Sequence, residues 1–314
     1  MRVIPLGTSS GRPTVARHVS GLAVDLGRSW ILIDCGEGTQ QQIMRSPLKP
    51  SRLAAILITH LHGDHVLGLP GLLGTLGMEG RTAPLQIVGV DGIGRWLDVM
   101  CDLPILGIDF PMTLTELVDD SLDGVAGEPL HVADVDGFAV YALALRHRVP
   151  AFGYRIVEPD RPGHIDIDAA RRVGVTNGPD LGRLQRGESV IGSLGEVRPA
   201  QVIGPQRRGL AVTVLGDTAR CDASVSLAFD ADLLVHECTY ANADQDLAER
   251  WKHSTPADAT WVANQAGVGH LVLNHFSTRY DDPSLLLNEA RTAFVNTTLA
   301  NELAPIDVPA ADPT

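Results

Sequence analysis

A short apolar run that ends in a dense cluster of histidine and aspartate constrains this chain more than any other feature. Residues 54–59 are AAILIT, and residues 60–65 are HLHGDH. An almost wholly apolar run of this length indicates a buried β-strand that stops at a polar site. His60 and His62 are two residues apart, so at an extended strand end both imidazoles lie on one face and can converge on one ion.

The rest of this cluster can reach a second ion. Gly63 allows a sharp turn, after which Asp64 and His65 can point to a position a few ångströms away. Imidazole and carboxylate together suit zinc or manganese. The alternative is a loop of unrelated surface histidines. Four ligand-type residues within six positions, directly after a strand, favour the metal site.

Three later apolar runs also end in polar residues. They are residues 210–216 before Asp217, 232–236 before Glu237, and 270–273 before Asn274 and His275. Further strands are expected at 22–26, 30–34, 85–88 and 139–145, and helices at 254–266 and 284–294. Strands and helices in this mixture, with polar residues at the strand ends, predict an α/β protein whose site lies at one edge of its sheets.

Length and composition exclude several classes of protein. The chain has 314 residues, of which 44% are hydrophobic and 20% charged, so it can bury a large core and is not a disordered chain. No apolar run approaches the length of a membrane helix, and the first residues do not resemble a signal peptide. The cysteines are scattered, which fits a reducing compartment, and we therefore expect a cytoplasmic protein.

One segment differs in charge from the rest of the chain. The net charge of −13 argues against a general nucleic-acid-binding coat, but residues 161–208 carry eight arginines against five acidic residues. This Gly- and Pro-rich segment is either a poorly packed surface insertion or a projecting arm that touches an anionic partner. The last residues, 304–314, are expected to form a disordered tail.

The motif H-x-H-G-D-H resembles the signature of the metallo-β-lactamase superfamily. The resemblance implies one catalytic domain over residues 1–314, an αββα sandwich of two mixed β-sheets flanked by helices, with an inserted flexible arm. It also implies two metal ions per chain, zinc or alternatively manganese. One ion would be held by His60, His62 and His147, and the other by Asp64, His65 and His275, with Asp217 bridging both.

Longer stretches are similar to the tRNase Z family over almost the whole chain. They are residues 6–11 (LGTSSG), 34–40 (DCGEGTQ), 68–73 (GLPGLL), 152–155 (FGYR), 236–239 (HECT), 253–255 (HST) and 275–280 (HFSTRY). One departure is His18, where the family usually has Asn after an Arg. The replacement touches none of the implied metal ligands.

This second resemblance implies a zinc-dependent endoribonuclease that removes the 3′ trailer from precursor tRNA. The tRNA would keep a 3′-hydroxyl and the trailer a 5′-phosphate. Asp64 would be the general base, or alternatively a ligand only. Glu237 would orient His253, which would pass a proton to the leaving oxygen. Arg279 and Ser277 would contact the substrate, with a surface ion pair as the alternative for Arg279.

The resemblance also gives the insertion a role. In bacterial members an arm in this position binds the tRNA away from the cut, and here residues 177–179 (NGP) precede Arg183 and Arg186. A homodimer is implied, with the arm of one subunit holding the tRNA that the other cuts, and no membrane partner. Two other functions stay open. A hydrolase of arylsulfates, cyclic nucleotides or small phosphodiesters would need no arm, and a non-catalytic RNA-binding module would need no proton-transfer residues.

Overall fold

The computed structural model describes residues 1–102, 107–119, 122–176 and 178–309, and these form two compact units. The main unit consists of Met1–Val157 and Leu210–Thr314, and the inserted unit consists of Glu158–Gly209. The inserted unit covers the segment that the sequence sets apart by its charge.

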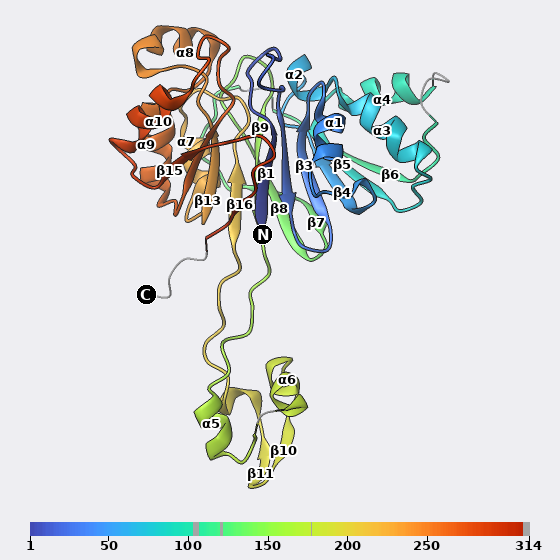
Figure 1. The fold of residues 1–314 in the computed structure, drawn as a ribbon, viewed down its shortest axis with the longest axis vertical. Helices are drawn as coiled ribbons and strands as arrows, with labels where there is room; N and C mark the ends of the chain where they lie inside the picture. Colours follow the sequence, from blue (N-terminus) through green and yellow to red (C-terminus); the bar gives the residue numbers. More distant parts are fainter. Residues whose placement is uncertain (103–106, 120–121, 177, 310–314) are drawn as a thin grey trace. The chain divides into compact units, whose positions relative to one another are not determined.

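Two mixed sheets, each of seven strands in the described part of the chain, form the centre of the main unit (Figure 1). The first has the order β16 (Ile306–Asp307), β1 (Arg2–Gly7), β2 (Gly21–Asp25), β3 (Trp30–Cys35), β4 (Leu53–Leu57), β5 (Leu85–Val90) and β6 (Met112–Leu117). The second has the order β15 (Thr297–Leu299), β14 (Leu271–Asn274), β13 (Leu233–Glu237), β12 (Ala211–Val214), β9 (Phe152–Val157), β8 (Phe138–Ala144) and β7 (Leu130–Val135).

Helices cover the outer face of each sheet. On the first sheet these are α1 (Thr39–Arg45), α2 (Gly63–Val66), α3 (Leu69–Met78) and α4 (Ile93–Asp102). On the second sheet they are α7 (Asp222–Ala228), α9 (Pro256–Ala266) and α10 (Ser284–Arg291). The remaining helical segments of the main unit are α8 (Gln245–Trp251) and the short 3₁₀ turns η1 (Pro50–Arg52) and η3 (Asn242–Asp244). This αββα sandwich is the fold that the resemblance implied.

The residues of β3 show how the sheets are buried on both faces. Ile31 and Ile33 lie in the core between the two sheets, whereas Trp30 and Leu32 lie in the core beneath the helices. Successive side chains of a strand point to opposite faces, and here both faces are covered. The strand is therefore apolar throughout, which is why it can be recognised as a buried strand from its sequence.

The strand directions bring the candidate residues to one edge of each sheet. In the second sheet β12, β13 and β14 are parallel, and β8 runs the same way because β9 is antiparallel to both β8 and β12. In the first sheet β3 and β4 are parallel. The segments after β4, β8, β12 and β14, and the last residue of β13, carry the predicted ligands and Glu237. These residues are far apart in sequence, but they lie at the ends of strands that run in the same direction, and so they meet at one edge of each sheet.

The inserted unit has a small core of its own. It contains α5 (Ile167–Arg172), α6 (Pro179–Gln185), the hairpin of β10 (Val190–Gly192) and β11 (Gly195–Val197), and the 3₁₀ turn η2 (Pro199–Gln201). Its buried side chains are Ala170, Val175, Leu184, Val190, Val197 and Val202. A poorly packed insertion does not fit this core. Of residues 177–179 (NGP), residue 177 lies outside the described residues, and Gly178 precedes α6.

The expectation of a disordered tail over 304–314 is wrong for its first part. Residues Ile306 and Asp307 form β16, which is antiparallel to β1. Val308 is buried in the core between the sheets, because the edge of β1 offers unpaired backbone groups and an apolar surface to the chain end. Residues 310–314 lie outside the described residues. Among the residues that are described, no helix is long and apolar enough to cross a membrane.

Candidate metal centre

One group of ligand atoms comes from the loop after β4, the loop after β8 and the loop after β12. Nε2 of His60 lies 2.9 Å from Nδ1 of His62, which lies 3.5 Å from Nε2 of His147. Oδ2 of Asp217 is 3.7 Å from Nε2 of His60. Three imidazole nitrogens and one carboxylate oxygen thus face a common centre.

A second group lies on the other side of Asp217. Nε2 of His65 is 3.5 Å from Oδ2 of Asp64 and 3.5 Å from Oδ1 of Asp217. Nε2 of His275 is 3.5 Å from the same oxygen of Asp64 and 3.3 Å from Oδ1 of Asp217. Asp217 therefore presents one oxygen to each group. All seven predicted ligands are brought together, although they come from four segments, which follow β4, β8, β12 and β14.

Two of the imidazoles are oriented by Asp34, at the end of β3. Nδ1 of His65 donates to Oδ2 of Asp34 at 2.7 Å. The hydroxyl of Thr59 donates to the same carboxylate and so accepts from Nδ1 of His60, at 3.0 Å. Both rings therefore carry their proton on Nδ1 and turn the lone pair of Nε2 toward the centre. Asp34 has a φ of 58°, a left-handed conformation that, among residues other than glycine, Asp and Asn tolerate best.

The other two Nε2 ligands are held in the same way. Nδ1 of His147 donates to the carbonyl of Lys252 at 2.9 Å. Nδ1 of His275 lies 3.0 Å from the hydroxyl of Thr239, which donates to Glu237 at 2.7 Å. His275 itself has a φ of 60°. Backbone strain of this kind persists only where surrounding contacts hold it, and it is common at functional sites.

Burial and charge prepare these groups to bind cations. Burial lowers the pKa of His60 well below its usual value and also lowers the pKa of His147, which keeps both rings neutral. Burial opposes the charged form of Asp217, but the histidines beside it outweigh this and hold its pKa well below its usual value. His60 and His147 thus offer neutral imidazoles beside an ionised carboxylate, which are the protonation states that metal binding requires.

The donor set fits two divalent ions. Ligand atoms about 2.0–2.1 Å from a tetrahedral ion are separated by about 3.3–3.4 Å, close to the distances in the second group. Nε2 of His275 is buried and has no hydrogen-bond partner among the described residues, yet carboxylate oxygens lie on two sides of it. Such a nitrogen needs a cation rather than another protein group.

A proton-carrying pair lies beside this centre. Nδ1 of His253 lies 2.8 Å from Oε1 of Glu237 and 3.9 Å from Oδ2 of Asp217. Burial disfavours the charged ring, but the carboxylates of Glu237 and Asp217 outweigh burial and raise the pKa of His253 to about 9. The backbone N–H groups of Thr218 and Thr239 donate to Glu237 and fix its position. His253 is therefore held as an imidazolium that faces the site.

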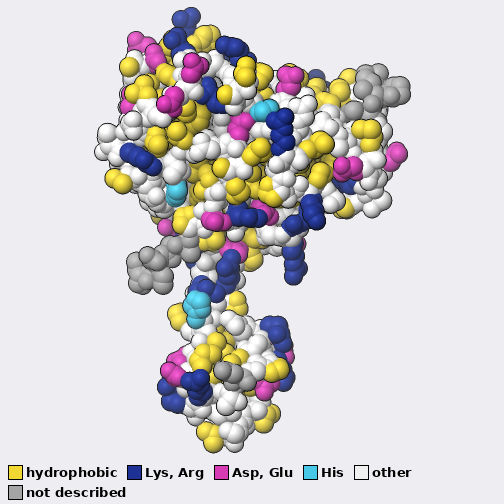
Figure 2. Space-filling model, in the orientation of Figure 1, with side chains coloured by type: hydrophobic (Ala, Val, Ile, Leu, Met, Phe, Trp, Pro, Cys, Tyr) yellow, Lys and Arg dark blue, Asp and Glu magenta, His cyan; other side chains and the backbone are white. Residues whose placement is uncertain are grey.

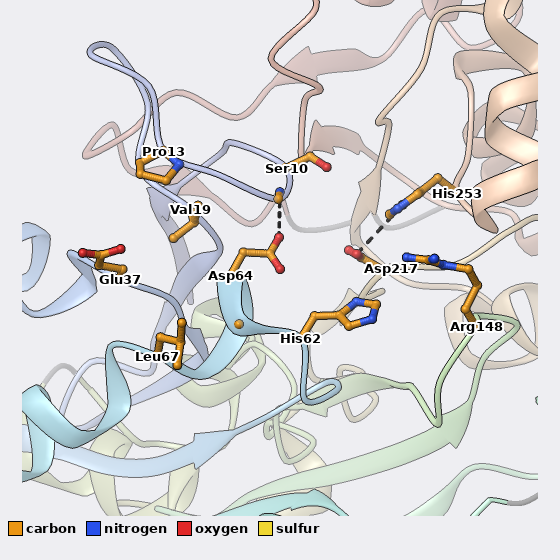
Figure 3. Close-up of a pocket in the computed structure, with 12 residues that line it drawn as sticks. Ser10, Pro13, Val19, Glu37, His62, Asp64, Leu67, Arg148, Asp217 and His253 are labelled. Atoms are coloured by element: carbon orange, nitrogen blue, oxygen red, sulfur yellow. Dashed lines mark hydrogen bonds and ion pairs between the residues drawn. The ribbon is translucent and has the colours of Figure 1, made fainter.

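An open cavity of about 380 Å³ leads to these groups (Figure 3). Its lining residues are Ser10, Gly11, Pro13, Val19, Glu37, His62, Gly63, Asp64, Leu67, Arg148, Asp217 and His253. The N–H of Gly11 donates to Oδ2 of Asp64 at 2.7 Å, which ties the loop after β1 to the centre. The cavity is open to solvent, and polar side chains form much of its lining.

The predicted substrate contacts lie elsewhere. Ser277 and Arg279 follow His275 but do not line this cavity, and the hydroxyl of Ser277 accepts from the N–H of Arg279. Arg183 and Arg186 belong to the inserted unit, where both contact Glu188, at 3.1 and 3.2 Å. Figure 2 shows arginine and acidic side chains side by side on that unit. These ion pairs are exposed and can be exchanged for phosphate contacts at little cost.

Sequence reasoning missed several residues that shape the site. Asp34 and Thr239 lie within recognised stretches, but nothing in their spacing shows that they orient histidines. Arg148 lines the cavity but lies in none of these stretches. The departure His18 is accommodated by Glu302, which accepts from the backbone N–H of His18 at 2.7 Å and contacts its Nδ1 at 2.8 Å. The contact between His18 and Glu302 joins residues near the two ends of the chain, so no local sequence pattern marks it.

Comparisons with known proteins agree with this geometry. A model of the metallo-beta-lactamase superfamily matches residues 15–143. The ribonuclease Z of Myxococcus xanthus (strain DK1622) is 42% identical over 296 residues, which are 94% of this chain and 93% of that protein. The ribonuclease Z of Bacillus cereus (strain B4264) is 40% identical over 315 residues, 98% of this chain and 99% of that protein.

A solved structure shows the same arrangement of the chain. The crystal structure of human tRNase Z, short form, is 30% identical and superposes with a TM-score of 0.73 over 99% of this chain and 100% of that one. Two metal-ligand groups joined by one aspartate, an αββα sandwich and full-length similarity to these proteins lead to one conclusion. The chain belongs to the ribonuclease Z family of the metallo-β-lactamase superfamily.

Proposed function

We propose that this enzyme is an endoribonuclease that removes the 3′ trailer from precursor tRNA. The observation that carries the proposal is the pairing of two complete ligand groups, joined by Asp217, with a protonated His253 beside them. A binding module would need no acid at this position. An enzyme for small phosphodiesters would need the same centre but no inserted unit with surplus arginine.

The ligand set supports two ions per chain, and zinc is the ion that we propose, with manganese as the alternative. His60, His62 and His147 would hold one ion, Asp64, His65 and His275 would hold the other, and Asp217 would bridge them. Imidazole-rich sets with carboxylates suit zinc and also accept manganese. When bound, such a pair of ions neutralises phosphate charge and activates water for attack.

The carboxylate of Asp64 serves as the general base in this proposal. Burial opposes its ionised form, but the imidazoles of His275 and His65 beside it outweigh burial and hold its pKa far below its usual value. It therefore stays ionised and can accept the proton of an attacking water. The N–H of Gly11 holds the same carboxylate from the loop after β1, so its oxygens cannot turn away from the cavity.

His253 acts at the other end of the cleaved bond. Its Nδ1 is bonded to Glu237, which leaves the other ring nitrogen to donate to the leaving 3′-oxygen. The raised pKa keeps this acid charged at neutral pH. Proton delivery to that oxygen leaves a 3′-hydroxyl on the tRNA, and attack by water leaves a 5′-phosphate on the trailer.

The inserted unit, with Arg183 and Arg186, would bind the tRNA away from the cut. Arg279 and Ser277 would contact RNA outside the cavity. We further propose a homodimer that acts in the cytoplasm, with the arm of one subunit holding the tRNA cut by the other. Exposed apolar side chains on and between the helices of the first sheet support a self-association surface, among them Met44, Leu67 and Met78.

A cleavage assay tests the proposal. Purified enzyme is incubated with an unprocessed precursor tRNA, and the products are separated on a denaturing gel. We expect one cut at the base of the trailer, loss of cutting after chelation, and recovery with added zinc or manganese. Cutting that survives complete removal of metal would contradict the proposed centre. Hydrolysis of a small phosphodiester without any cutting of precursor tRNA would contradict the proposed substrate.

A further inference from the structure

Arg148 rests on an aromatic ring at the rim of the cavity. Its guanidinium carbon lies 4.7 Å from the ring centroid of Trp251, the last residue of α8. The guanidinium of Arg250 lies 5.3 Å from the same ring. One tryptophan thus carries two cations. Arg148 lines the same cavity as His62, Asp217 and His253, and Figure 3 shows its side chain beside them.

The stack is tied to the metal centre through neighbouring residues. Nδ1 of His147 donates to the carbonyl of Lys252 at 2.9 Å, and Arg148 and Trp251 are the residues next to this bonded pair. The contact that orients a metal ligand therefore also brings the arginine onto the tryptophan. Arg148 consequently keeps a defined position relative to the centre, although its side chain is exposed.

Among the described residues, the charge of Arg148 has no acidic partner. In the described part of the chain neither Arg148 nor Arg250 forms an ion pair with a carboxylate, in contrast to Arg183 and Arg186 of the inserted unit. Stacking on a ring occupies the face of a guanidinium and leaves its N–H groups, which lie in the plane, free to donate. The guanidinium of Arg148 is thus a fixed cation with free N–H donors beside a site that cleaves phosphodiesters. Such a group can bind a phosphate oxygen.

We propose that Arg148, held on Trp251, binds a backbone phosphate of the single-stranded 3′ end of the RNA, next to the phosphodiester that is cut. The proposal rests on the proposed function and adds a nucleotide subsite to it. Arg250 adds positive charge to the same platform. The phosphate that is cut lies over the metal ligands. Arg148, at the rim of the cavity, therefore contacts the next phosphate along the RNA strand.

The test compares two substrates in Arg148→Ala. For precursor tRNA we expect KM to rise about 10-fold or more, because one charge-assisted phosphate contact is lost. The slope of log KM against log salt should become shallower by about 0.7, the contribution of one phosphate on a single strand. Bis(p-nitrophenyl) phosphate has no neighbouring phosphate, so its hydrolysis should stay at the wild-type rate. Arg148→Lys should lose less than Arg148→Ala, and Trp251→Leu should resemble Arg148→Ala.

Arg220→Ala is the matched control. Arg220 makes the same kind of stack, 4.0 Å from the ring centroid of Trp261, but does not line the metal cavity. It should leave KM for precursor tRNA unchanged. An unchanged KM in Arg148→Ala, an equal loss in Arg220→Ala, or an equal loss on both substrates in Arg148→Ala would each overturn the subsite. A wild-type enzyme that does not cut precursor tRNA would instead overturn the proposed function.

Discussion

At the scale of single residues, Asp34 shows how the centre depends on groups that never touch a metal. Its carboxylate accepts from Nδ1 of His65 and from the hydroxyl and N–H of Thr59. Through Thr59 it also sets the proton position of His60. One carboxylate thus orients a ligand in each of the two groups. Removing the charge of Asp34 should therefore weaken the binding of both metal ions.

We therefore expect Asp34→Asn to lower zinc affinity about 10–100-fold, the usual effect of losing such an orienting partner. Asn tolerates the left-handed backbone at this position, so the fold should persist. Competition with a chromophoric chelator measures the affinity. Asp136→Asn is the control, since Asp136 also has a positive φ, of 53°, but lies in the turn between β7 and β8. Equal affinities in all three proteins would show that Asp34 does not orient the ligands.

The pKa of His253 gives a second expectation at this scale. A general acid must be protonated, and Glu237 and Asp217 raise the pKa of His253, against burial, to about 9. Single-turnover cleavage by the wild type should therefore fall as the pH rises through about 9. Glu237→Gln removes the first of these carboxylate charges, so the fall should move to lower pH, toward the ordinary imidazole value.

His253→Ala completes this test. It should retain its metal and bind precursor tRNA normally, but cleave about 10²–10⁴-fold more slowly, the usual cost of a lost acid. The alkaline fall should be absent. If Glu237→Gln keeps the wild-type pH profile, Glu237 does not tune the acid, and if His253→Ala cleaves at the wild-type rate, His253 is not the acid.

The ligands could be predicted from the sequence, but their supports could not. The H-x-H-G-D-H cluster is local, and the later ligands each follow an apolar strand, so residue type and context mark them. The bonds from His147 to Lys252 and from His65 to Asp34 join residues 105 and 31 positions apart. Arg148 and Trp251 are separated in sequence by about as many residues as His147 and Lys252. Such contacts arise from strand order, which no local pattern encodes.

At the scale of elements, the loop after β1 is held by the far end of the chain. Glu302 accepts from the N–H of His18 at 2.7 Å and from the amide of Gln42 at 2.9 Å, and contacts the hydroxyl of Thr8. The same loop donates the N–H of Gly11 to Asp64. Glu302, which follows β15, thus holds the loop after β1 in place, and this loop lines the cavity.

Replacing Glu302 with Ala should therefore cost about 1–3 kcal/mol in the free energy of unfolding, since partly buried donors lose their acceptor. Urea denaturation of the full chain measures this. Glu79→Ala, at the exposed end of α3, should change the value by less than about 0.5 kcal/mol. Equal stability of Glu302→Ala and wild type would mean that water replaces the carboxylate without loss.

Elements marked by an apolar run or by a helix-start signal could be predicted, and the elements of the inserted unit could not. The strands expected at 22–26 and 30–34 correspond to β2 and β3, and the helix expected at 254–266 corresponds to α9. Elements of the inserted unit have three to seven residues, too few for a hydrophobic period to show. β16 has two residues and forms because β1 offers an open edge.

At the scale of the whole molecule, we expect the main unit to fold without the inserted unit. Val157 at the end of β9 is paired with Ala211 at the start of β12, so a short Gly/Ser turn can replace residues 158–209. We expect the shortened protein to keep its metal and to hydrolyse a small phosphodiester at the wild-type rate.

Precursor tRNA should be processed much more slowly by this shortened protein, mainly because it binds more weakly. Each arginine that contacts phosphate contributes about one unit to the salt dependence of binding, so the slope should also flatten. Equal processing of precursor tRNA by both proteins would show that the insertion is passive. Loss of metal together with both activities would show that the insertion supports the fold rather than the substrate.

We propose that the centre formed by the seven metal ligands, together with the imidazolium of His253, cuts precursor tRNA by attack of water. Mapping the two new RNA ends tests this most directly. The account predicts one cut at the base of the trailer, with a 3′-hydroxyl on the tRNA and a 5′-phosphate on the trailer, and no cut after chelation. A 2′,3′-cyclic phosphate on the tRNA with a 5′-hydroxyl on the trailer would contradict it, because those ends arise from attack by the RNA's own 2′-hydroxyl.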